Sequence, residues 1–238
     1  LMIYAHYDGQ PVDPEHWASD PWTPVLRDGP VELGGRDVPM QGPFDPEWRI
    51  VARSATYRER SEALRRTGRD GGEVLPQLVA SAVGELERLR EHADPALLGR
   101  AARLVLSGER VHVLAQRRAF PVAAYLAYSL HQADKKTVLI DGIGGLMRQQ
   151  VHAISRRDLL IAVSYQPYAE ETVHMVEAAV AHQCPILAIS DSLVSAVAKP
   201  ANRVLQVREA EIRKFRSLSS SMCLAQALAI AYAFATSR

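Results

Sequence analysis

Three loops that follow apolar, strand-like segments hold the side chains best suited to binding a ligand. They share hydroxyl, amide or guanidinium groups placed where a strand gives way to a helix, and they are Gln116, Arg117, Arg118, Ser164, Tyr165, Gln166, Tyr168, Ser190 and Ser192. Free backbone N–H groups at a helix start attract anions such as phosphate. Guanidinium groups add charge-assisted hydrogen bonds. The sequence therefore predicts a site for a small anion.

These residues also have ordinary structural interpretations. Arg117 and Arg118 could be solvated loop charges, and Ser164 could cap the helix that follows it. The run Ser190-Asp191-Ser192 is also common turn chemistry. The sequence leaves both interpretations open for each loop.

The elements that must position these loops alternate along the chain from residue 108 onward. Short apolar runs predict strands at 111–114, 137–140, 159–163, 186–189 and 204–207. Helical segments are expected at about 121–132, 145–153, 170–182 and 216–236, with a short turn at 193–199. Such alternation predicts an α/β fold: a three-layer, doubly wound sandwich around a five-stranded parallel sheet. Ligand loops then lie at the carboxyl ends of the strands, near a topological switch point.

Two helices precede the first of these strands. Leu75, Leu78, Val79, Val83, Leu86 and Leu89 recur at spacings of three and four, which predicts an amphipathic helix. A second helix is expected to begin at Asp94-Pro95, where the aspartate caps and the proline fills the first turn, and to stop at Gly108.

Bulk composition excludes several classes of protein. The 238 residues carry a formal net charge of +1, which gives no general field for nucleic acid or membranes. The two cysteines are too few for a disulfide scaffold or a cysteine-rich zinc site and suit a reducing cytoplasm. No apolar run is long enough to span a bilayer, so a cytoplasmic protein without membrane contact is expected.

The chain from about residue 72 to 238 resembles the SIS domain, specifically the effector domain of MurR/RpiR-type transcriptional regulators. The resemblance rests on VHVLAQRRAFPVAAYLAYSL, LLIAVSYQPYAEETV and PILAISDSLVSAVAKPANRVLQV. It implies a five-stranded parallel sandwich, a homodimer, and a phosphosugar ligand held by the loops at 115–119, 164–169 and 190–192. The chain departs from the family pattern where Ala115, Arg117 and Ala119 replace Gly-x-Gly-x-Ser, and where Pro167 and Ala169 replace a glycine and a hydroxyl residue. The arginines could compensate, so an anionic ligand is still expected.

Binding without catalysis is the simpler expectation. Sugar isomerisation needs a positioned base near the sugar carbonyl, and nothing in the sequence pairs a candidate base with a second acid or a nucleophile. We therefore predict no catalytic residue and no cofactor. An aldose–ketose isomerase is the alternative, with Glu170 or Glu171 as its base.

Residues 1–55 differ in character, because they are rich in proline and hold all three tryptophans. A strand is expected at residues 1–5. The segment resembles a fragment of a di-zinc aminoacylase/carboxypeptidase-like (M20-type) peptidase, in which His6 would bind zinc and Asp8 would orient it. The metal-bridging aspartate expected after Ala55 is missing, so His6 and Asp8 are interpreted as vestigial and no metal is predicted. A zinc peptidase is the least favoured function.

The expected organisation is a truncated peptidase-like segment over 1–55, a linker over 56–71 and the SIS domain over 72–238. The join suggests a chimera of two genes, and the start inside a strand-like run suggests a fragment. The helix-turn-helix domain of a full regulator is not visible. The basic run at 57–69 reads as a solvated helix face, so DNA binding by this chain alone is not expected.

Overall fold

The structure is a computed structural model that describes residues 25–27, 37–38, 49–51, 71–212 and 215–236. The chain divides into two compact units, Leu1–Arg69 and Asp70–Arg238. In the first unit, β1 (Val25–Arg27), β2 (Asp37–Val38) and β3 (Arg49–Val51) pair antiparallel in the order β2-β1-β3. The sequence had predicted none of these strands. The strand expected at 1–5, and His6 and Asp8, lie outside the described residues.

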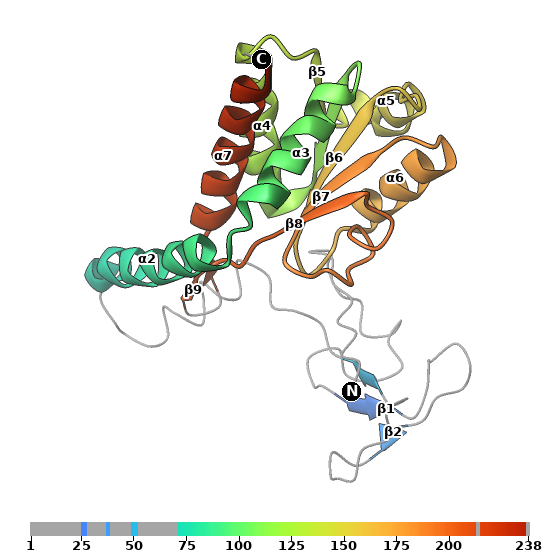
Figure 1. Ribbon diagram of the computed structural model, residues 1–238. Coiled ribbons are helices and arrows are strands. Elements are labelled where there is room, and N and C mark those ends of the chain that lie inside the picture. The colour runs from blue at the N-terminus through green and yellow to red at the C-terminus, as the bar shows by residue number, and fades with distance from the viewer. Residues whose placement is uncertain (1–24, 28–36, 39–48, 52–70, 213–214, 237–238) are drawn as a thin grey trace. The chain divides into compact units, whose positions relative to one another are not determined.

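The second unit is built on a five-stranded parallel sheet, as predicted (Figure 1). Its strands are β4 (Val111–Ala115), β5 (Thr137–Ile140), β6 (Leu159–Ser164), β7 (Ile186–Ser190) and β8 (Arg203–Gln206). They lie in the order β5-β4-β6-β7-β8. From β4 the chain crosses to β5 at one edge of the sheet. It then returns to β6, which lies on the other side of β4. The topological switch point lies between β4 and β6, so a ligand is expected beside the loops that follow these two strands.

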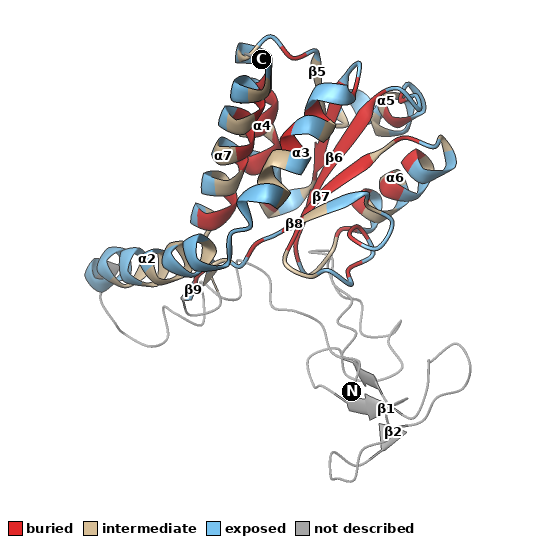
Figure 2. Cartoon of the chain, in the orientation of Figure 1, coloured by how far each residue is buried: buried red, intermediate tan, exposed pale blue. Residues whose placement is uncertain are grey.

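Helices cover both faces of the sheet. They are α2 (Val74–His92), α3 (Pro95–Ser107), α4 (Phe120–Gln132), α5 (Met147–His152), α6 (Glu170–Ala181) and α7 (Ser219–Thr236). Alternate side chains of each strand point to opposite faces. Val113, Ile161 and their neighbours pack with α3, α4 and α7, whereas Leu114 and Leu160 pack with α5 and α6. Figure 2 shows the buried strands between the buried faces of these helices.

The helix boundaries follow local chemistry. The side chain of Asp94 accepts a hydrogen bond of 2.8 Å from the backbone N–H of Ala96, which caps α3 as predicted, and Gly108 follows the last residue of the helix. The segment 193–199 forms turns and no helix. The last helix begins at Ser219, because Phe215–Arg216 forms strand β10, which pairs antiparallel with β9 (Glu211–Ile212).

Helix α2 is the exception to the layered packing. Its apolar stripe divides, since Leu78, Leu86 and Leu89 are half-buried while Leu75 and Val79 are 67% and 53% exposed. It contacts α7 and β9, and none of its residues is fully buried (Figure 2).

Helix α7 is the one helix in the described part of the chain with the length and mean hydropathy to cross a membrane. Core helices pass the same test. Ala225, Leu228, Ala229 and Tyr232 of α7 are buried in the core shared with α3 and α4, as expected of a core helix.

Candidate anion-binding site

The first candidate loop follows β4 at the switch point. A 3-10 turn (Arg117–Ala119) leads directly into α4, and Arg117 has a left-handed backbone with φ 57°. The Arg117 side chain lies 3.7 Å from the carboxylate of Glu171 at the start of α6. Both side chains are partly exposed, so this ion pair contributes little to stability.

Arg118 occupies a different environment from Arg117. Its guanidinium carbon lies 4.9 Å from the ring centroid of Tyr165, within the range of a cation–π interaction. Its Nη1 atom is buried and has no hydrogen-bond partner among the residues that the structure describes. Burial, followed by the positive charge of Arg216, lowers the pKa of Arg118. Arg118 still remains charged in a protein. A buried cation with an unused donor is suited to meeting an anion.

The second candidate loop follows β6 and contributes three side chains with separate partners. The Tyr165 hydroxyl is buried and donates a hydrogen bond of 2.6 Å to Ser221 Oγ. The backbone N–H of Gln166 and the hydroxyl of Tyr168 both donate to the carboxylate of Asp191, each at 2.9 Å. Asp191 follows β7, so these contacts join two neighbouring loops. Burial raises the pKa of Tyr165 and, with the bond to Asp191, raises the pKa of Tyr168 to about 12.

A third group of polar atoms lies at the start of α7. The carboxylate of Glu209 accepts hydrogen bonds from the backbone N–H groups of Ser221, at 2.7 Å, and Ser220, at 3.3 Å. Burial raises the pKa of Glu209, while these bonds and Arg118 act in the opposite direction. The Ser220 side chain is 1% exposed, and its hydroxyl has no partner among the described residues.

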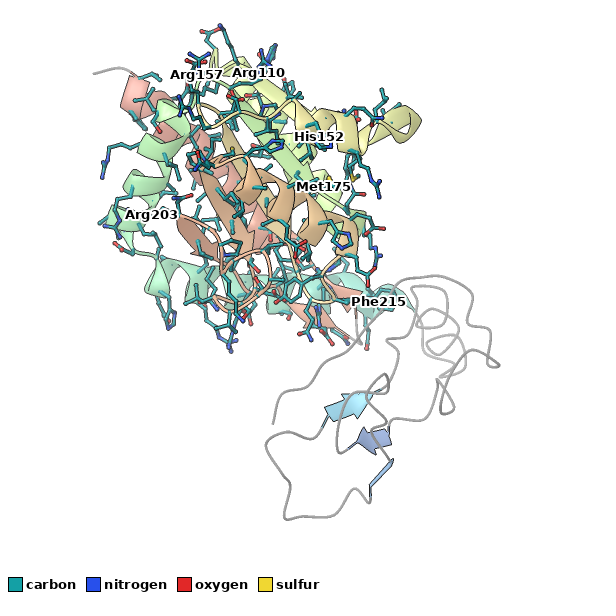
Figure 3. The ribbon with its side chains drawn as sticks, turned by 90° about the vertical axis from the view of Figure 1, so that its right-hand side faces the viewer. Arg110, His152, Arg157, Met175, Arg203 and Phe215 are labelled. Atoms are coloured by element: carbon teal, nitrogen blue, oxygen red, sulfur yellow. The ribbon has the colours of Figure 1, made fainter. Side chains whose placement is uncertain are left out.

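The β9–β10 hairpin connects the site to the loop after β6. Arg216 donates to Glu211 at 2.8 Å and to the backbone carbonyl of Gln166 at 2.6 Å. Figure 3 shows Phe215 of this hairpin at the opposite end of the unit from Arg110 and Arg157, which precede β4 and β6. The polar cluster therefore lies at the carboxyl edge of the sheet.

The remaining predicted residues are less directly available. Ser164 ends β6 and is buried, and Gln116 is half-buried with an Nε2 atom that lacks a partner in the described part of the chain. Ser190 is fully buried, with its hydroxyl 3.0 Å from that of Ser195. Ser192 accepts a hydrogen bond from the backbone N–H of Val194. Ser190, the last residue of β7, and Ser192 thus make hydrogen bonds within the turn that follows, in line with the alternative interpretation of this loop.

The arrangement combines two guanidinium groups with two carboxylates and several hydroxyl donors. Arg118 and Arg216 come from different loops, and Asp191 and Glu209 lie close enough to affect the pKa of Arg118. Arg118 Nη1, Gln116 Nε2 and Ser220 Oγ are among the buried side-chain atoms that have no hydrogen-bond partner within the described residues. Such groups are costly unless a partner satisfies them. The described residues contain no cluster of three or more histidine, cysteine, aspartate or glutamate side chains that could hold a metal.

A pocket of about 550 Å³ lies elsewhere, between α5 and α6. Its wall includes Arg148, His152, His174 and Met175, of which Figure 3 labels His152 and Met175. It shares Glu171 with the surroundings of the candidate site but none of the predicted ligand-binding residues.

The sequence of this chain matches the model of a known protein family. The model of the SIS domain matches residues 105–231, more than half of the chain. The chain belongs to the SIS family. No curated protein matches its sequence.

Solved structures of other SIS proteins share the fold. The RpiR transcription factor from Sphaerobacter thermophilus (sugar isomerase domain) superposes with a TM-score of 0.65 at 21% identity, over 68% of this chain and 91% of that one. The Vibrio vulnificus NanR protein complexed with ManNAc-6P gives 0.62 at 20% identity, over 76% and 69%. A protein of E. coli CFT073 in complex with A5P gives 0.60 at 12% identity, over 69% and 90%. At these identities the likeness establishes a shared fold.

Sequence reasoning missed several residues that the SIS fold brings to the site. They are Glu209, Arg216, Ser220 and Ser221, which lie between β8 and the first turn of α7. Asp191 lies in the predicted 190–192 loop, for which ligand contact and turn chemistry were both left open. A serine run before an apolar helix was a usable signal, because serines commonly occupy helix starts. Nothing local indicated that Glu209 would turn back onto that helix.

Proposed function

We propose that residues 72–238 form an SIS domain that binds a phosphorylated sugar or a related anionic carbohydrate derivative at the carboxyl edge of its sheet. The observation that supports this most directly is Arg118, a half-buried cation whose buried Nη1 donor is unused within the described residues beside the switch point. The second cation, Arg216, lies close enough to repel Arg118. Binding of an anion would offset this repulsion. Two proteins of similar fold are described in complex with ManNAc-6P and with A5P, which is consistent with this ligand class.

The ligand contacts proposed from the sequence remain those of the three loops, with Arg118, Gln116, Tyr165 and Tyr168 best supported by geometry. Arg117 points toward Glu171 and is proposed at the rim of the site. Ser220 is added because its buried hydroxyl lacks a partner in the described region. No cofactor takes part in this function.

We further propose that the domain is the effector part of an RpiR-type transcriptional regulator, working in the cytoplasm as a homodimer. The likeness to the Sphaerobacter thermophilus factor and to NanR supports this context. Residues 56–71 then serve as the linker. The family match leaves residues 1–104 uncovered, so the peptidase resemblance over 1–55 has no support from it.

A thermal-shift panel on the whole chain tests the ligand class. Sugar phosphates, amino-sugar phosphates, inorganic phosphate, sulfate and zinc are compared, and a ligand at 100 times its dissociation constant stabilises the fold by about 2.7 kcal/mol. We expect one phosphosugar to raise the melting temperature and Arg118→Ala to abolish the rise. Arg203→Ala is the control, since this exposed arginine lies at the amino end of β8. A panel in which no phosphosugar acts, or in which Arg118→Ala responds like wild type, contradicts the proposal.

A sugar-phosphate isomerase is the second candidate, and Glu209 is the observation that favours it. This partly buried carboxylate has a raised pKa, as a general base requires, whereas Glu170 and Glu171 are exposed. Turnover of an aldose phosphate that Glu209→Gln eliminates, with ligand binding retained, would replace the binding-only function.

A further inference from the structure

Asp191 makes the most specific contacts in the candidate site. One carboxylate oxygen accepts from the backbone N–H of Gln166 and the other from the Tyr168 hydroxyl, both at 2.9 Å. Its backbone carbonyl accepts from Gln206 Nε2 at 3.2 Å. Both oxygens are thus bound to donors of the segment that leads into α6.

An anion bound before α6 would need the same two donors, the backbone N–H of Gln166 and the hydroxyl of Tyr168. Gln166 and Tyr168 lie just before α6, where the positive end of the helix dipole favours negative charge. The high pKa of Tyr168, caused by burial and by Asp191, keeps its phenol protonated as a donor at neutral pH. An anion thus already occupies the donors before α6, and that anion is the domain's own Asp191 side chain.

The backbone beneath Asp191 is held separately from its carboxylate. Ser190 is buried at the end of β7 and pairs with Ser195, while Val207 donates to the Ser190 carbonyl at 3.0 Å. Gln206 holds the carbonyl of Asp191 itself. Rotation about the side-chain bonds of Asp191 can consequently free both donors while the β7 loop keeps its place.

We propose that Asp191 is an internal competitor for the anionic group of the ligand, which binds before α6 only by displacing this carboxylate from its two donors. This inference rests on the proposed function. A ligand carboxylate would only exchange one singly charged group for another. A phosphate monoester brings a second negative charge to Arg118 and Arg216, so it gains where a carboxylate does not.

Asp191→Asn tests the inference, because it removes the charge and keeps the shape. Isothermal titration at mildly alkaline pH, where inorganic phosphate is mainly the dianion, supplies inorganic phosphate and acetate as the dianionic and monoanionic probes. We expect the variant to bind phosphate roughly tenfold more tightly than wild type, since a competing charge-assisted hydrogen bond is lost. Its affinity for acetate should rise as well, since neither anion has to displace a carboxylate in the variant.

Glu177→Gln is the matched control, since it removes an equal charge from an exposed position within α6, away from its first turn. The backbone amide signal of Gln166 in a ¹⁵N spectrum shows that the variant is folded and that its acceptor has changed. Phosphate affinity that is unchanged or weaker in Asp191→Asn, while a phosphosugar still binds wild type, overturns this inference alone. Absence of binding by every phosphorylated compound in both proteins overturns the proposed function and this inference with it.

Discussion

The guanidinium of Arg118 lies 4.9 Å from the ring centroid of Tyr165, and the hydroxyl of the same tyrosine donates to Ser221 at 2.6 Å. One side chain thus links the loop after β4 to the first turn of α7, a contact that no local sequence pattern predicts. The guanidinium of Arg118 contacts the ring of Tyr165, and its Nη1 atom has no hydrogen-bond partner within the described part of the protein. The contact with Tyr165 therefore sets the position of the free donor that the proposed ligand would use.

Replacing Arg118 with lysine should separate the contribution of the positive charge to ligand binding from that of the guanidinium geometry. Lysine keeps one positive charge but lacks the planar fork and stacks less well on an aromatic ring. We expect Arg118→Lys to retain the fold and to weaken phosphosugar binding by roughly tenfold, the loss of one good charge-assisted bond. Titration calorimetry measures the change. Equal affinity in the lysine variant would show that the guanidinium fork makes no ligand contact.

Removing the Tyr165 hydroxyl should destabilise the fold. Tyr165→Phe leaves the fully buried Ser221 Oγ without its donor, and a buried unsatisfied group costs about 1–3 kcal/mol. The ring remains, so the contact with Arg118 is kept. Urea unfolding gives the change in the free energy of unfolding. Tyr168→Phe is the comparison, and its half-buried hydroxyl should cost less.

The central sheet should be sensitive to loss of apolar volume. Leu160 is fully buried in β6 on the α5–α6 face, and a change of buried leucine to alanine costs about 2–5 kcal/mol. Leu193→Ala, in the turn after β7, removes the same atoms from a side chain that is 56% exposed and should have little effect. Equal costs for the two variants would contradict the layered core.

Stability should fall as the solution becomes acidic. His112 is buried in β4, and burial lowers its pKa in the folded protein below the usual value of about 6.5, although Asp158 at 3.7 Å acts in the opposite direction. The unfolded chain therefore binds a proton more readily than the folded one, and stability is lost as pH falls below about 6.5. Burial acts to raise the pKa of Asp158, but its bonds to Ser155 and the neighbouring charges lower that pKa overall, which adds to the loss of stability at more acidic pH.

Melting temperatures measured between pH 8 and pH 5 test this dependence, and the pH range is chosen to span the reference value of about 6.5. His112→Asn should flatten the part of the curve near neutrality. A fold whose melting temperature rises in this direction would show that His112 gains a proton on folding.

The proposed homodimer is expected to involve the exposed stripe of α2. Leu75, Val79 and Val83 are four residues apart, so they lie on one side of the helix. Val79→Asp should shift the chain toward the monomer in light scattering while the circular dichroism spectrum is kept. Arg88→Asp is the control, because nine positions further on the helix has turned about half a revolution. A dimer that survives Val79→Asp is built on another surface.

Most of the sheet could be predicted because its signal is local. Runs such as 137–140 and 186–189 are apolar, bounded by polar turns and separated by helical periodicity, so their number and parallel direction follow from the sequence alone. The boundaries differed by one or two residues, as at β8. The start of α7 shifted because Phe215 and Arg216 join a hairpin, and a two-residue strand leaves no periodic signal.

The candidate site was only partly predictable, because its contacts are long-range. Arg118 and Tyr165 followed from their places at strand ends. The roles of Asp191 and Glu209 depend on a fold that brings residues 25 positions apart, such as Gln166 and Asp191, into hydrogen-bonding distance. A carboxylate that folds back onto backbone amides has the same local sequence as one exposed in a turn. Only the tertiary structure distinguishes them.

The place of Glu209 has a consequence for how occupancy of the site could be felt elsewhere. Its carboxylate holds the first amides of α7 and also interacts with Arg118, so it belongs to both the candidate site and the helix. Helix α7 in turn contacts α2, whose outer side is exposed. If the proposed ligand draws Arg118 away from Glu209, the charge balance at the first turn of α7 changes, and α7 is the element that joins the candidate site to α2.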